Sequence, residues 1–135
     1  MKKRSSKTVV LYLAVGFGAG LGALLRFWCG LAVAGLVESG LWTTAFVNIS
    51  GSFAIVFFAA IVGPDGRWPV GSVGRQFVMG GVCGGFTTFS AMSLDTLLLI
   101  LRGEPLRAIF YLLTVVILSL AAGWMGHLLA RATQD

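Results

Sequence analysis

The stretch GGVCGGFTTFSAMS, residues 80–93, lies in the middle of an apolar segment and decides the fold. Four of its residues are glycines, and Thr87, Thr88, Ser90 and Ser93 carry hydroxyl groups. Paired glycines weaken a helix by about 1 kcal/mol each relative to alanine. A helix broken at membrane depth persists only where its freed backbone groups are buried or line a cavity. Exposed carbonyls coordinate cations, and helix N-termini attract anions. We therefore expect a transmembrane helix that is broken at its centre to create an ion site.

The composition around this stretch is that of an integral membrane protein. Of 135 residues, 57% are hydrophobic and 11% are charged, with a mean hydropathy of +0.92. A soluble domain of this length needs a polar surface that these residues cannot supply. The net charge of +5 is concentrated near the chain ends and loops, with no basic stripe interleaved with aromatics. We predict one membrane domain, residues 1–135, that does not bind nucleic acid.

Four segments are long and apolar enough to cross a bilayer as helices, which takes about 20 residues each. They cover residues 8–37, 41–62, 76–101 and 108–129, with short charged connections that contain Gly or Pro. The first apolar run is longer than that of a signal peptide and has no suitable cleavage site, so we expect it to stay attached. The predicted fold is all-α, with four transmembrane helices.

The basic residues predict the orientation of these helices. Seven lie on the side that carries both termini, and only Arg102 and Arg107 lie on the other side. Positive residues favour the cytoplasm, so both termini are expected there. The spacings Gly16/Gly20 and Gly18/Gly22 indicate close helix packing and favour an oligomer.

Polar side chains recur on single faces of the other expected helices. Thr44, Asn48 and Ser52 are four residues apart, and Tyr111 and Ser119 are eight apart. Such groups either form hydrogen bonds between helices or line a polar path. Hydroxyl and amide donors without a fixed cation, beside the positive ring edge of Phe89, suit a small hard anion.

Other potential chemistry finds no support in the sequence. His127 is the single histidine and has no nucleophile motif near it, so we predict that the chain is not an enzyme. Cys29 and Cys83 lie far apart in apolar runs, which argues against a disulfide or metal framework. Arg26 and Asp95 are costly inside a membrane, and each either serves an internal site or extends to an interface.

At three places the sequence resembles the Fluc (CrcB) family of fluoride channels. Residues 80–93 resemble the family signature GGxxGGxTTFSTFS, VNISGSF at 47–53 resembles its VNxxGS/G motif, and GALLRFW at 22–28 resembles its GxxLR motif. The three motifs occur in the family order, and the resemblance covers essentially the whole chain. Met92 replaces the second phenylalanine of the signature, Val115 replaces a polar residue, and Asp95 replaces a glutamate.

The resemblance implies a channel that exports cytoplasmic fluoride passively from a prokaryote, in whose plasma or inner membrane it lies. It implies an antiparallel, dual-topology dimer with two pores and a structural sodium ion at its centre. The implied fluoride-pore residues are Asn48, Phe89, Met92, Thr88, Ser90, Tyr111, Ser119 and Arg26. The implied sodium ligands are the backbone carbonyls of Gly84 and Thr87. The implied partners are fluoride, sodium, the lipid bilayer and a second copy of the chain, although the charge bias leaves a heterodimer with a paralogue open.

Two other functions are compatible with four short transmembrane helices. A proton-coupled small multidrug transporter needs a membrane-buried glutamate in its first helix, and residues 8–37 contain none there. A non-transporting assembly subunit would not need aligned polar faces. Fluoride efflux from liposomes distinguishes all three.

Overall fold

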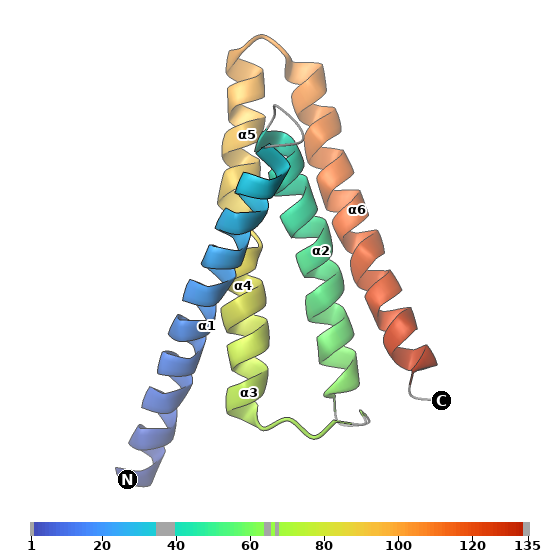
Figure 1. Ribbon diagram of the computed structural model, residues 1–135. Coiled ribbons are helices and arrows are strands. Elements are labelled where there is room, and N and C mark those ends of the chain that lie inside the picture. Colours follow the sequence, from blue (N-terminus) through green and yellow to red (C-terminus); the bar gives the residue numbers. More distant parts are fainter. Residues whose placement is uncertain (1, 35–39, 64–65, 67, 134–135) are drawn as a thin grey trace.

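The computed structural model describes residues 2–34, 40–63, 66 and 68–133, and the regular structure among them is entirely helical (Figure 1). The helices are α1 (Lys2–Ala34), α2 (Gly40–Ile61), α3 (Ser72–Gln76), the π-helix η1 (Phe77–Cys83), α4 (Gly84–Phe86), α5 (Phe89–Leu101) and α6 (Pro105–Ala132). Figure 1 shows both chain ends at the same end of the molecule, as an even number of spans predicts.

Four spans in the described residues are long and apolar enough to cross a membrane: Ser6–Val33, Gly40–Ile61, Ser72–Leu101 and Pro105–Ala132. The all-α membrane fold is therefore confirmed, and each predicted helix overlaps one of these spans. α1 and α6 begin earlier than residues 8 and 108, while the predicted end of the first helix at residue 37 lies outside the described residues. Pro105 opens α6 as its first residue, where the missing N–H of proline is harmless.

The third span is broken, as predicted, but not at its glycines. Gly80, Gly81, Gly84 and Gly85 all lie in helical segments, and none has a positive φ. The break falls just after them, at Thr87 (φ −75°, ψ 160°) and Thr88 (φ −152°, ψ 114°), which are extended. Before the break the helix widens into the π-helix η1, a rare form that is frequent at functional sites.

The glycines instead allow α1 to pack closely against the third span. A Cβ on Gly81 would stand 2.9 Å from Gly18 Cα, and one on Gly18 would stand 2.6 Å from the Phe77 oxygen. A Cβ on Gly85 would collide with the backbone of Ala19. We call these contacts the glycine seam. The expectation that Gly18/Gly22 favours an oligomer needs correction, because both residues are used inside one chain: a Cβ on Gly22 would collide with the Val82 oxygen.

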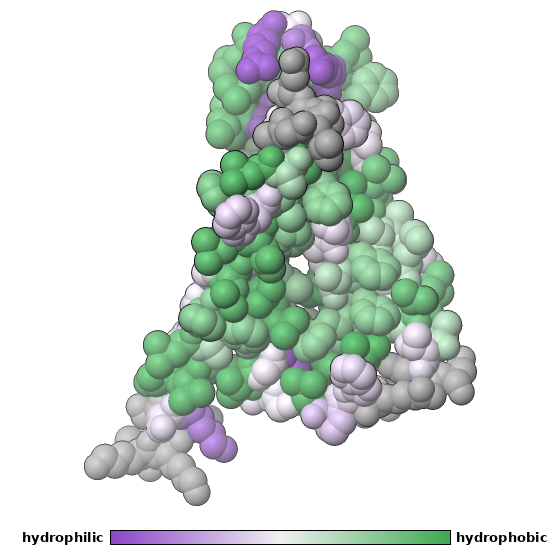
Figure 2. All heavy atoms as spheres, in the orientation of Figure 1, coloured by the Kyte–Doolittle hydropathy of each residue, from purple (hydrophilic) through white to green (hydrophobic). Residues whose placement is uncertain are grey.

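The interior of the chain is thin. Its fully buried large side chains are Val47, Leu99 and Val115, among the described residues. Many large apolar side chains are exposed, and Figure 2 shows a broad hydrophobic belt between more hydrophilic ends. Such a surface is suited to contact with lipid or with another membrane chain.

α2 and α6 pack along each other beside the broken third span. A Cβ on Gly126 would stand 2.7 Å from the Phe53 oxygen, so the two backbones approach closely at this end. At the opposite end, Gly103 (φ 79°) closes the turn between α5 and α6, and its N–H bonds to the Ile100 oxygen at 2.9 Å. A left-handed glycine of this kind is a common way to end a helix.

Candidate ion site at the broken helix

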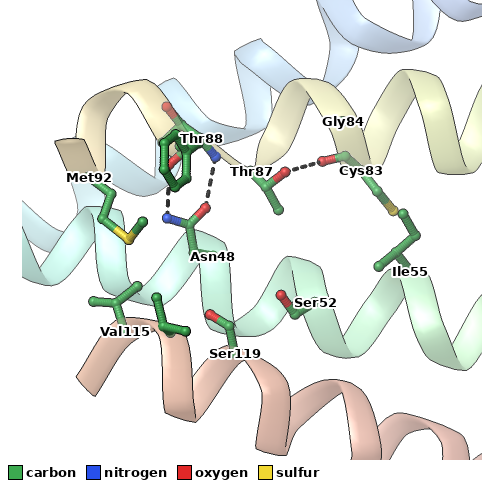
Figure 3. Close-up of a pocket in the computed structure, with 12 residues that line it drawn as sticks. Asn48, Ser52, Ile55, Cys83, Gly84, Thr87, Thr88, Met92, Val115 and Ser119 are labelled. Atoms are coloured by element: carbon green, nitrogen blue, oxygen red, sulfur yellow. Dashed lines mark hydrogen bonds between the residues drawn. The ribbon is translucent and has the colours of Figure 1, made fainter. Parts of the chain in front are cut away.

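Asn48 on α2 holds the break in the third span (Figure 3). Its Nδ2 donates to the Thr88 oxygen at 2.9 Å, and its Oδ1 accepts from the Thr88 N–H at 2.8 Å. Both backbone groups of Thr88 are thus satisfied by one side chain, as a neighbouring strand would satisfy them. Asn48 and Thr88 are each only 9% exposed, and unpaired backbone groups at such depth are costly. The second N–H of the Asn48 amide is not used by these two bonds.

Thr88 also caps α5. Its Oγ1 accepts from the Ala91 N–H at 3.1 Å and lies 3.2 Å from the Ser90 Oγ. The cap leaves the N–H groups of Phe89 and Ser90 at the start of a helix, where the helix dipole favours an anion. Two predicted site residues, Thr88 and Ser90, therefore lie together at a positive helix end.

The break also removes a helical partner from Gly84. In a continuous helix the Thr88 N–H would donate to the Gly84 oxygen, but here it donates to Asn48. Thr87 still bonds to the preceding helix, since both its N–H and its Oγ1 donate to the Cys83 oxygen at 3.0 Å. A Cβ on Gly51 would collide with the Thr87 methyl group, so the glycine of the α2 motif makes room for this residue.

Arg26 extends to the break rather than to a membrane interface. Its Nη1 donates to the Thr87 oxygen at 3.0 Å, and its side chain is half-buried. Of the two alternatives that the sequence leaves open for Arg26, an internal site or an interface, this contact favours the internal site. The guanidinium places a fixed positive charge beside the freed backbone of the third span.

Asn48, Thr88, Phe89, Met92 and Ser119 line one groove of about 340 Å³. The groove runs between α2, α6 and the broken helix, and Figure 3 shows Ser119 on α6 near Ser52 on α2. Among the described side chains, Ser119 Oγ is the one buried nitrogen or oxygen atom without a hydrogen-bond partner. Such an atom is rare in a folded protein and marks a position suited to bind a ligand or water.

Phe89 and Met92 occupy different surroundings in this groove. Phe89 is 76% exposed, whereas Met92 is 4% exposed. Within one chain the phenyl ring therefore lies at the open edge of the groove, and the methionine lies in its wall. The two positions of the family's phenylalanine pair are not equivalent in a single chain.

Tyr111 does not line this groove. Its hydroxyl donates to Asp95 Oδ2 at 3.1 Å, and the buried Thr44 lies close to the same hydroxyl. Thr44, Asp95 and Tyr111 belong to three different expected helices, and nothing in the sequence pairs them. Asp95 also lines a small polar cavity of about 220 Å³ with Arg102 and Arg107, near the α5–α6 turn. Spacing along one helix could not show this link, because it joins three helices.

Comparison with known proteins fits this arrangement. The family model described as "CrcB-like protein, Camphor Resistance (CrcB)" matches residues 13–127. The chain belongs to the CrcB family. It is 53% identical over 129 residues to the fluoride-specific ion channel FluC 3 of Brucella abortus, covering 95% of this chain and 94% of the relative. It is 46% identical over 121 residues to FluC 1 of Rhodopseudomonas palustris, covering 89% and 86%, and 45% identical over 126 residues to FluC of Methylocella silvestris, covering 90% and 93%.

Membership of the CrcB family accords with three predictions from the sequence. The relatives are named as ion channels, which supports a transport function and argues against an enzyme. Together with the four membrane spans, it identifies the chain as a multi-pass membrane protein of a prokaryote.

Proposed function

We propose that this protein is a fluoride-selective channel that releases fluoride from the cytoplasm passively. Relatives of up to 53% identity carry the name of fluoride-specific ion channels. The observation that supports this most directly in the chain is the unpartnered Ser119 Oγ in a groove that also holds the amide of Asn48. Fluoride holds its water tightly, so a path for it must offer several hydrogen-bond donors in place of that water. In acidic surroundings hydrogen fluoride crosses the membrane and ionises inside, and the channel releases the trapped anion.

Each predicted pore residue has a distinct place in this proposal. Asn48 offers its second N–H to fluoride while its other groups hold the break. Thr88, Ser90 and Ser119 supply hydroxyl groups, and the start of α5 adds N–H groups. Phe89 presents a ring edge at the open side of the groove, and Met92 forms its apolar wall. Tyr111 lies nearer the start of α6 than Ser119 does, and Arg26 supplies positive charge near the break.

The freed backbone at the break also suits a structural sodium ion. Sodium prefers oxygen ligands, and the Gly84 oxygen has lost its helical partner to Asn48. The Thr87 oxygen accepts from Arg26, yet a carbonyl has two lone pairs and can take a second partner. Two carbonyls are too few for one cation, so we propose that the same pair from a second copy completes the site. Bound sodium would add a fixed positive charge between the two chains.

A second copy is part of the proposed channel. Phe89, the open groove and Gly84 all face away from the core of one chain, and an antiparallel dimer would cover them and form two pores. Opposite orientations place the two broken helices face to face at the same membrane depth.

Liposome flux tests this function. Proteoliposomes loaded with potassium fluoride should release fluoride when valinomycin carries potassium, and the same vesicles loaded with chloride should retain it. Comparable chloride release would contradict fluoride selectivity. Absence of fluoride release would favour an assembly subunit, and fluoride release that requires a proton gradient would favour a proton-coupled transporter.

A further inference from the structure

The groove at the broken helix does not end at Ser119. Ser119, Ser52 and Ile55 also line a second groove of about 480 Å³, which is continued by Gly123, Trp124 and His127. The two grooves share a wall, so together they follow α6 and α2 toward the end of the molecule where both termini lie (Figure 1).

His127 lies on the same face of α6 as the proposed polar path. Ser119, Gly123 and His127 follow one another at steps of four on α6, and all three line the second groove. Between Ser119 and His127 the lining on α6 comes from Leu120, Gly123 and Trp124, and Gly123 adds no side chain to it. A Cβ there would stand 3.3 Å from the Val56 side chain.

The side chain of His127 is half-buried and lies tilted beside the indole of Trp124. Its ring centroid lies 5.9 Å from that of Trp124, with an interplanar angle of 37°. The face of an indole attracts a cation at this distance, so the contact suits a protonated imidazole. Trp124 also restricts where the histidine ring can lie at the end of the groove.

Few other charges act on this position. α2, which packs against α6 here, carries no titratable side chain between Gly40 and Ile61. On α6 itself the nearest charged group is Arg131, one turn beyond His127 and exposed. His127 is therefore the titratable group among the described residues that line this second groove.

We propose that His127, with Trp124, forms an entrance site for small inorganic anions at the end of the groove near the termini. Histidine is the residue type suited to a change of charge near neutral pH, and the entrance attracts anions more strongly when the imidazole carries a proton. A unit charge about 7 Å from an anion in water raises the local anion concentration about threefold. This inference rests on the proposed function, because it assigns the entrance of the same fluoride path.

The pH dependence of fluoride efflux tests this entrance. Initial rates are measured in liposomes with equal pH on both sides, at about pH 6 and about pH 8, where fluoride is ionised. Leakage from protein-free liposomes is subtracted. The wild-type rate should be about threefold higher at the lower pH. His127→Gln should lose this difference, and His127→Lys should give a high rate at both pH values.

The control is Arg131→Gln, which removes a charge that does not titrate in this range and should keep the wild-type pH difference. All variants are first checked by gel filtration, and only those that elute as the wild-type oligomer are used. If one His127 variant fails this check, the other is sufficient to test the entrance. A wild-type pH difference that survives in His127→Gln overturns the inference, as does its loss in Arg131→Gln. A wild-type protein with efflux but no pH difference overturns it too. Absence of efflux at every pH rejects the proposed function and the entrance together.

Discussion

Asn48 performs a structural task that its residue type alone does not reveal. The sequence places it on the face of α2 that carries Thr44 and Ser52, and the cost of a buried amide predicts a partner. The partner, however, is the backbone of Thr88, forty residues away, held by two hydrogen bonds. A backbone becomes available as a partner only where a helix breaks, and the exact position of the break is a tertiary property.

We expect Asn48→Ala to impair both folding and flux. It leaves the Thr88 N–H and oxygen unpaired, at a cost of about 1–3 kcal/mol for each buried group. Asn48→Asp keeps an acceptor for the N–H but sets a carboxylate against the Thr88 oxygen. Thermal aggregation in detergent, followed by gel filtration, should begin at a lower temperature for both variants, and fluoride efflux should fall by an order of magnitude or more.

Ser50→Ala is the matched control for Asn48. Ser50 lies two residues further along α2 and is bonded only to the Phe46 oxygen of its own helix. The Ser50→Ala substitution should change neither the temperature at which aggregation begins nor the fluoride efflux. An Asn48→Ala protein with wild-type values of both would show that the break does not depend on this side chain.

Phe89 and Met92 are predicted to differ in their effect on flux because they differ in exposure. Phe89 is 76% exposed and free to meet an ion or a partner chain, while Met92 is 4% exposed within the wall. We expect Phe89→Ile to lower initial fluoride efflux several-fold, since it removes a polar ring edge worth about 0.5–1.5 kcal/mol. Met92→Phe should change efflux less than Phe89→Ile does, because it substitutes one apolar wall residue for another. Both are measured at matched protein density. A large gain for Met92→Phe together with a tolerated Phe89→Ile would reverse this ranking.

At the scale of the helices, the glycines of the third span do not act as their low helix propensity suggests. Weak helix formers correctly predicted a broken third span, because low propensity and hydroxyl groups coincide at residues 80–93. The glycines nevertheless remain helical and serve the seam with α1. Propensity describes a segment by itself, whereas the seam depends on which helix lies beside it. The π-helix η1 has no sequence signal beyond the paired glycines and was not predicted.

Substitutions at the adjacent residues Gly84 and Gly85 distinguish packing within the chain from packing between chains. Gly85→Ala should destabilise the chain by about 1–3 kcal/mol, because its Cβ collides with the backbone of Ala19. Gly84→Ala meets only the Met79 oxygen at 3.7 Å, an ordinary contact. Any loss of stability in Gly84→Ala must therefore arise outside the chain, at the proposed sodium site or the partner.

The measurement is thermal stability in detergent with sodium and with N-methylglucamine as the cation. Wild type and Gly85→Ala should both be stabilised by sodium, with the Gly85→Ala curve lower throughout. Gly84→Ala should lose the difference between the two cations. If Gly84→Ala keeps the full sodium effect, its carbonyl is not part of a cation site.

At the scale of the whole molecule, the composition predicts the membrane fold reliably. It does not predict how copies of the chain assemble. Four apolar spans follow directly from segment length and hydropathy, and the structure contains all four in its described residues. The exposed apolar belt has the same character whether lipid or a second chain covers it, since both are hydrocarbon surfaces. The number and direction of the copies therefore cannot be deduced from hydrophobicity.

Orientation is the property on which the sequence and the proposed assembly disagree most. Seven basic residues on the side of the termini against two on the other side favour one direction of insertion, whereas an antiparallel homodimer needs both. We expect the polar contacts at the two breaks to favour the mixed pair, so a cysteine added after residue 135 should react with impermeant thiol reagents on both sides of the membrane. Cys29→Ala and Cys83→Ala remove the natural thiols first. Cross-linking in liposomes should give a product of twice the 14.2 kDa chain mass. Labelling from one side only, in a preparation that still conducts fluoride, would contradict the antiparallel homodimer.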